Sequence, residues 1–215
     1  MKRLIGISCV YLSFVAGMLP AAETNSSKDP LQRLVEGNKR FVTSTSVCHS
    51  DWTAKRAALA EGQRPFAVVV SCSDSRVPPE IVFDQSLGDI FVVRLAGNIV
   101  DDFALGSIEY GVQNLGASII LVLGHANCGA VSAALKNLKF DDHIQAVVDA
   151  IHPAIKDIKG TSSDDLEKAI KANAKYVVAQ LKNAKPAISR LVSQEKIKIV
   201  AGYYRLDTGA VDILD

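Results

Sequence analysis

The sequence predicts an α/β domain in which a mainly parallel β-sheet is flanked by helices, with a helical arm before it. Short apolar runs bounded by turn residues alternate along the chain with segments of helical periodicity. Such alternation favours parallel strands joined by helical crossovers. Residues 66–71 (Phe-Ala-Val-Val-Val-Ser) are almost continuously apolar, which is typical of a strand covered on both faces.

The remaining elements follow in order from local signals. Asp29 and Pro30 are a helix cap and a first-turn proline, and the helix they open runs to Phe41, its apolar pattern interrupted only at Asn38. A second, short helix is expected at residues 53–60. Further strands are expected at residues 90–94, 118–123, 197–203 and, more briefly, 210–214. Helices are expected at residues 101–115, at 144–158, where Pro153 would bend the helix, and at 162–181.

The first residues are typical of an export signal. Lys2 and Arg3 precede an uncharged, mostly apolar run at residues 4–19, and Pro20-Ala21-Ala22 supplies small residues for cleavage. The alternative, an uncleaved membrane anchor, would need a longer run. We therefore expect a cleaved signal peptide at 1–22, a helical arm at 23–62 and the main α/β domain at 63–215. The mature chain would have no membrane span and would be periplasmic or secreted.

Charge and composition exclude some kinds of partner. The 215 residues include 24 basic and 23 acidic side chains and are 48% hydrophobic, a globular composition. No basic tract offers a surface for nucleic acid. We therefore expect a small ligand and no nucleic-acid partner.

Metal-binding side chains follow two of the predicted strands directly. Cys72, Asp74 and Arg76 come after residues 66–71, and His125 and Cys128 come after the strand that begins at residue 118. Open α/β sheets place their sites beyond the carboxyl ends of strands. If the two strands are neighbours, the side chains of Cys72, Asp74, His125 and Cys128 form a ligand set for tetrahedral zinc. Should Asp74 pair with Arg76, zinc would keep three protein ligands and an open position, as catalytic zinc does.

Two alternatives remain open at this stage. Removal of the signal leaves Cys48, Cys72 and Cys128, and a Cys72–Cys128 disulfide in a binding protein is the alternative to a metal. A non-catalytic zinc module would instead hold Asp74 on the metal permanently. Cys48 and His49 form a further Cys/His pair, but it is isolated in a polar loop.

The same residues resemble the β-class carbonic anhydrases. Cys-Ser-Asp-Ser-Arg-Val at 72–77, with His-x-x-Cys-Gly at 125–129, is similar to the family's metal-binding motifs. The likeness extends to residues 34–41, 91–94, 96–98, 107–111 and 203–209, and so covers nearly the whole mature chain.

The resemblance implies the activity and its site. Cys72, His125 and Cys128 would hold one Zn²⁺ per chain, with Asp74 and Arg76 as a catalytic dyad. A zinc-bound hydroxide would hydrate carbon dioxide reversibly to bicarbonate and a proton. The substrate-binding residues would be Gln63, Phe91, Tyr110 and Gly129. The Gln63 amide would hydrogen-bond an oxygen of CO2 or bicarbonate. Phe91 and Tyr110 would form apolar walls, and Gly129 would lie at a helix start. A homodimer or a dimer of dimers, with sites across the interface, is also implied.

Some details stay open within that family. Members with a regulatory bicarbonate pocket have a tryptophan three residues before the first cysteine ligand, and Val69 stands there in this chain. This argues against that regulation, although Asp74 as a fourth ligand in a closed state remains an option. A related hydrolase of CS2 or COS would use the same chemistry. His49, His143 and His152 are candidate proton shuttles by residue type alone.

Overall fold

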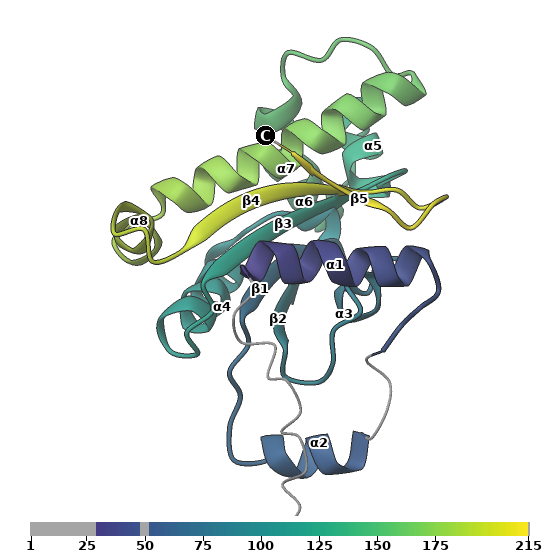
Figure 1. Cartoon of the computed structure of the whole chain (residues 1–215). Coiled ribbons are helices and arrows are strands. Elements are labelled where there is room, and N and C mark those ends of the chain that lie inside the picture. Colours follow the sequence, from purple (N-terminus) through teal and green to yellow (C-terminus); the bar gives the residue numbers. More distant parts are fainter. Residues whose placement is uncertain (1–28, 48–51, 215) are drawn as a thin grey trace, which may run out of the picture.

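A computed structural model describes residues 29–47 and 52–214, and it has the predicted α/β architecture (Figure 1). The predicted signal peptide, Cys48 and His49 lie outside the described residues. Five strands form one sheet in the order β2-β1-β3-β4-β5. The first four are parallel, and β5 runs antiparallel to β4. The strands are β1 (Ala67–Ser71), β2 (Ile90–Arg94), β3 (Ile119–His125), β4 (Lys198–Tyr204) and β5 (Val211–Leu214).

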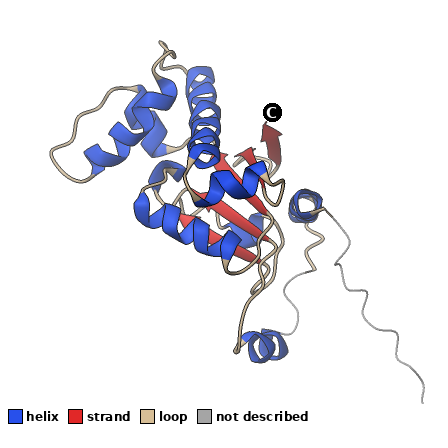
Figure 2. Ribbon diagram, turned by 90° about the vertical axis from the view of Figure 1, so that its left-hand side faces the viewer, coloured by secondary structure: helices blue, strands red, loops and turns tan. Residues whose placement is uncertain are grey.

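Helices cover both faces of this sheet, as the continuous apolar strands predict (Figure 2). Side chains alternate between faces along a strand. Val68 and Val70 therefore join one apolar cluster, and Ala67 and Val69 join another. The first cluster packs against α4 (Asp102–Gln113), α7 (Ser163–Asn183) and α8 (Ala187–Ser193), and the second against α1 (Pro30–Val42) and α3 (Pro79–Val82).

A third apolar cluster lies at the carboxyl ends of the strands. It joins Cys72 and Cys128 to α5 (Gly129–Leu135) and α6 (Ile144–Ile155). Pro153 lies inside α6. The two cysteines are thus packed mainly against aliphatic side chains at this edge of the sheet.

The first helix is part of the core, and Asn38 explains the break in its apolar pattern. Leu34 is fully buried among the strand residues of the second cluster. The Asn38 amide donates to the carbonyls of Val82 (3.1 Å) and Gly209 (2.8 Å) and accepts from the Val211 N–H (2.8 Å). One polar side chain therefore connects α1, α3 and the β4–β5 turn.

The helix signals mark most of the observed boundaries. The Asp101 carboxylate accepts from the Ala104 N–H at the start of α4, and Ser162 and Asp165 form a reciprocal capping box at the start of α7. The sequence did not predict α3, α8 or the 3-10 turn η1 (Ala96–Asn98). Each is shorter than the span over which periodicity becomes visible.

The second helix, α2 (Trp52–Leu59), has no buried residue and lies apart from the sheet at the bottom of Figure 1. Within the described residues, no helix has the length and apolarity needed to cross a membrane.

Candidate metal centre

The two predicted polar clusters meet at one edge of the sheet. Strands β1 and β3 are paired in parallel, with Ser71 opposite Leu123, so the residues that follow each strand emerge on the same side. The sulfur atoms of Cys72 and Cys128 and a ring nitrogen of His125 all lie within 4.8 Å of one another. The three residues are 6%, 1% and 0% exposed. Two sulfurs and an imidazole at this spacing are a ligand set that zinc favours.

His125 is oriented to offer one ring nitrogen to a ligand. Its Nδ1 lies 2.9 Å from the Ala126 carbonyl oxygen, and because a carbonyl only accepts, Nδ1 carries the proton. The lone pair is then on Nε2, which is buried without a hydrogen-bond partner among the described residues. A buried polar atom without a partner is costly. A metal ion bound at Nε2 would satisfy it, with Nδ1 fixed by a backbone carbonyl as in known metal sites.

The two thiols are free, so the structure contains no Cys72–Cys128 disulfide. Cys128 beside it lowers the pKa of Cys72 against the effect of burial, and the hydrogen bond from the Gly97 N–H adds to the lowering. Cys72 and burial raise the pKa of Cys128. The pair therefore favours one thiolate and one thiol when no metal is present. A cation at the site would favour ionisation of both, since the thiolate is the metal-binding form.

Asp74 and Arg76 form a bidentate ion pair at the rim of the donor set. Arg76 Nε lies 2.9 Å from Asp74 Oδ1, Nη2 lies 2.7 Å from Oδ2, and the Arg76 N–H donates to Oδ1 at 3.0 Å. The hydrogen bonds from the Arg76 side chain lower the pKa of Asp74 well below its usual value, against a smaller effect of burial. Asp74 Oδ2 is also 3.8 Å from His125 Nε2. Asp74 is thus an ionised acceptor beside the donor atoms, engaged by Arg76.

A neighbouring segment positions the loop that carries these residues. Arg94, at the end of β2, donates from Nε to the Cys72 carbonyl (2.9 Å) and from Nη2 to the Asp74 carbonyl (2.6 Å). The Gly97 N–H lies 3.3 Å from Cys72 Sγ. Sequence reasoning assigned no role to Arg94 or Gly97. Both residues lie in segments that resemble the β-class carbonic anhydrases, 91–94 and 96–98, and that likeness was the signal that could have pointed to them.

The predicted substrate-binding residues do not all lie beside the three donor residues. Gly129 begins α5 directly after Cys128, and the N–H groups of Ala130 and Val131 approach the Cys128 sulfur. Phe91 lies near the start of β2 and packs against half-exposed Tyr110, with ring centroids 6.3 Å apart.

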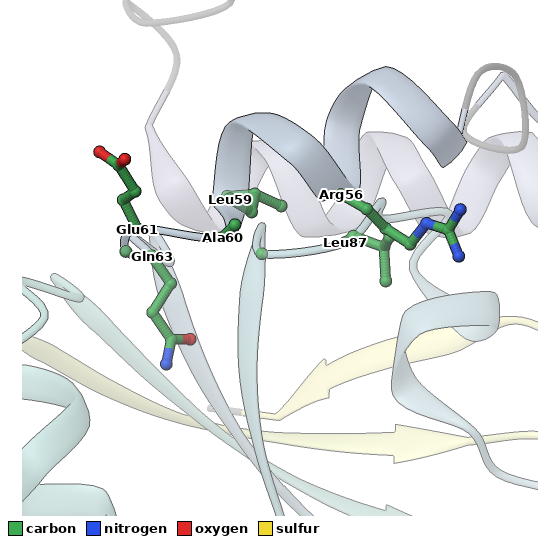
Figure 3. Close-up of a pocket in the computed structure, with 8 residues that line it drawn as sticks. Arg56, Leu59, Ala60, Glu61, Gln63 and Leu87 are labelled. Carbon is green, nitrogen blue, oxygen red and sulfur yellow. The ribbon is translucent and has the colours of Figure 1, made fainter.

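Gln63 precedes β1 and therefore lies at the opposite end of that strand from Cys72. Within one chain the structure does not bring it to the donor set. Gln63 lines a surface pocket near the end of α2 (Figure 3) that contains none of the three donor residues. We take the donor cluster, not this pocket, as the candidate site, because only the cluster has the chemistry of a metal centre. The lining residues are Arg56, Leu59, Ala60, Glu61, Gly62, Gln63, Leu87 and Gly88.

The described histidines other than His125 are outside the donor set. His143 is exposed immediately before α6, and His152 lies on α6 with Nδ1 3.7 Å from Asp149. Within the described residues, no hydrogen bond or ion pair joins either residue to Asp74, so neither gains support as a proton shuttle.

Comparisons with known proteins show that the chain is similar to carbonic anhydrases. A family model described as carbonic anhydrase matches residues 67–211. Carbonic anhydrase 2 of Mycobacterium tuberculosis is 39% identical over 186 residues, covering 85% of this chain and 90% of that protein. The carbonic anhydrase of Mycolicibacterium smegmatis is 39% identical over 184 residues, covering 84% and 89%. The solved structure of the β-carbonic anhydrase CcaA has a TM-score of 0.71 at 28% identity, covering 87% of this chain and 96% of that one.

Proposed function

The chain belongs to the β-class carbonic anhydrase family, and from that premise we propose that Cys72, His125 and Cys128 hold one zinc ion with which it hydrates CO2 reversibly to bicarbonate and a proton. The observation that carries the proposal is the convergence of two sulfurs and the unpartnered His125 Nε2 within 4.8 Å. When bound there, zinc would act as a Lewis acid that lowers the pKa of water towards about 7, the value reached in the unrelated three-histidine carbonic anhydrases.

Asp74 would act as the hydrogen-bond acceptor and orienting group beside the metal. Its carboxylate stays ionised because Arg76 donates to both oxygens. An ionised carboxylate can accept a hydrogen bond from the attacking nucleophile and aim its lone pair at CO2. Arg76 engages both oxygens of Asp74 and so opposes movement of the carboxylate into the ligand set. The fourth position then stays available for catalysis.

A homodimer would complete the substrate pocket. Gln63 is too far along β1 to reach the donor set of its own chain, because a strand rises about 3.3 Å per residue. Phe103 is 88% exposed and Tyr110 50% exposed on α4, and Trp52 is 41% exposed on α2. We propose that a second copy covers these side chains and that Gln63, Phe91 and Tyr110 line the partner's site. Replacement of Phe103 with glutamate should then dissociate the assembly in light scattering. An unchanged assembly mass would count against this interface.

We also propose that the protein is exported after cleavage near residue 22, which rests on the sequence of residues 1–22 alone. Fractionation of expressing cells, with mass spectrometry of the mature N-terminus, tests this. Full-length protein retained in the cytoplasm would contradict it.

The central experiment measures CO2 hydration and zinc in the same sample. Purified mature protein should contain about one zinc per chain and hydrate CO2 in stopped flow, with a rate that rises with pH as water ionises. Full zinc without CO2 turnover at any pH would contradict the proposed substrate.

Replacement of Asp74 with asparagine separates metal binding from catalysis. The variant should keep its zinc, because Asp74 is outside the donor set, and lose about 10²- to 10⁴-fold in turnover. Asp141→Asn is the matched control, because Asp141 is an exposed aspartate in the loop before α6 and its loss should leave the rate unchanged. An Asp74→Asn variant with the wild-type rate would remove Asp74 from the mechanism.

A further inference from the structure

Asn173 is a buried polar residue in an apolar part of α7. It is 1% exposed, and its helix neighbours Ala169, Ile170 and Val177 belong to the apolar clusters. Its Nδ2 donates to the Gly97 carbonyl at 2.8 Å, but its Oδ1 has no partner among the described residues. Burying half of an amide without a hydrogen bond is unfavourable. An apolar side chain of similar size would avoid that cost, so the packing of α7 alone does not account for asparagine here.

The backbone conformation of Gly97, the hydrogen-bond partner of Asn173, depends on its contacts. Gly97 has φ 68° and ψ 18°, a left-handed conformation that glycine adopts readily but among many others. A side chain would not fit, because a Cβ atom would meet Ile151 Cδ1 at 2.7 Å and Ala130 Cβ at 3.2 Å. The position therefore requires the residue type with the greatest backbone freedom. Its conformation depends on the contacts that its two peptide groups make.

Those two peptide groups bond to different residues. The N–H of Gly97 points to Cys72 Sγ at 3.3 Å, and its carbonyl accepts from Asn173. Fixing the carbonyl limits rotation about the Gly97 backbone and keeps the N–H aimed at the sulfur. Donors to a metal-binding side chain set its orientation and its affinity for the metal.

We propose that Asn173 is a positioning residue for the metal centre: it holds Gly97 so that the Gly97 N–H fixes the Cys72 sulfur in the ligand set. This rests on the proposed zinc site. Asn173 lies 76 positions from Gly97 in the chain and contacts neither a donor residue nor the Asp74–Arg76 pair in any hydrogen bond of the described residues. Its effect reaches the metal only through Gly97.

The test compares Asn173→Leu with Val177→Ala. Leucine has a side chain of similar size and removes the hydrogen-bond donor to the Gly97 carbonyl. Val177 lies one turn further along α7 and is 2% exposed. It makes no hydrogen bond to Gly97 among the described residues. Its truncation therefore loosens the packing of the same helix and leaves the Asn173–Gly97–Cys72 hydrogen bonds in place. The rate of zinc transfer from each folded enzyme to a chromogenic chelator is measured at a temperature below the unfolding transition. A second readout is the thiolate-to-metal absorption band of the Co²⁺-substituted enzymes.

Asn173→Leu should release zinc about 10-fold faster than wild type and shift the cobalt band, whereas Val177→Ala should match wild type in both despite its lower unfolding midpoint. If Asn173→Leu does not fold, Asn173→Ser, which is too short to reach Gly97, replaces it with the same expectation. Wild-type zinc release in the Asn173 variant, or equally fast release in Val177→Ala, would overturn the role of Asn173. Wild-type protein that binds no zinc would instead contradict the proposed function.

Discussion

Replacing Asp84 with asparagine is expected to remove a pH-dependent part of the protein's stability. The Asp84 side chain is 1% exposed at the end of α3. It accepts hydrogen bonds from the Arg40 guanidinium, the Ser46 hydroxyl and the Val47 N–H. This carboxylate thereby attaches the segment after α1 to the loop after α3.

The pKa of Asp84 sets the size and the pH range of the effect. Burial opposes ionisation, but the hydrogen bonds from Ser46, Arg40 and Val47 outweigh it and lower the pKa from 3.8 to about 2. Each pH unit between the folded and unfolded pKa corresponds to about 1.4 kcal/mol, so the ionised group contributes about 2.5 kcal/mol to the free energy of unfolding. Because the folded pKa is the lower one, this contribution is present above pH 3.8 and is lost as the pH falls towards 2.

Urea unfolding at a series of pH values from 6 to 2 measures the effect. Far-UV circular dichroism is the suitable signal, because the single tryptophan, Trp52, lies on the peripheral α2. The stability difference between wild type and Asp84→Asn should shrink by about 2 kcal/mol between pH 6 and pH 2. Asp89→Asn is the control, since Asp89 is 25% exposed and pairs with exposed Lys55, a kind of pair that contributes about 0–1 kcal/mol. A difference between wild type and Asp84→Asn that stays constant with pH would refute this account of Asp84.

Three further predictions concern the site and its support. Arg94→Ala removes both donors to the Cys72 and Asp74 carbonyls. Because the loop is then misplaced, kcat for CO2 hydration should fall about 10- to 100-fold. A wild-type kcat in stopped flow would show that the loop keeps its conformation without Arg94. Asn38→Leu leaves three backbone groups without their partner and should cost about 2–4 kcal/mol in urea unfolding, whereas Asn183→Leu, which loses only a local bond to Ala179, should cost little. Removal of zinc by a chelator should abolish activity and lower the thermal midpoint, and zinc but not magnesium should restore both; activity that survives complete metal removal would contradict the zinc site.

Local patterns were sufficient for most of the fold. The runs at residues 66–71 and 90–94 predicted β1 and β2, because buried parallel strands are recognisable as short apolar segments. Ser162 and Asp165 predicted the start of α7, because a capping box involves only neighbouring residues. Short elements such as α3 and α8 have too few residues to show a period, so the sequence did not indicate them.

The site also combines features that local sequence patterns predict with features that they do not. Residue types and their places after two strands predicted the donor residues Cys72, His125 and Cys128 and the Asp74–Arg76 pair, with a disulfide left open as the alternative. The surroundings of these residues depend on the packing of elements that are far apart in the chain. The structure showed that the two thiols are free and that Gly97 connects Asn173 to Cys72. Contacts between residues so far apart in the chain depend on how strands and helices pack across the sheet. No spacing along the sequence encodes that packing in a visible pattern.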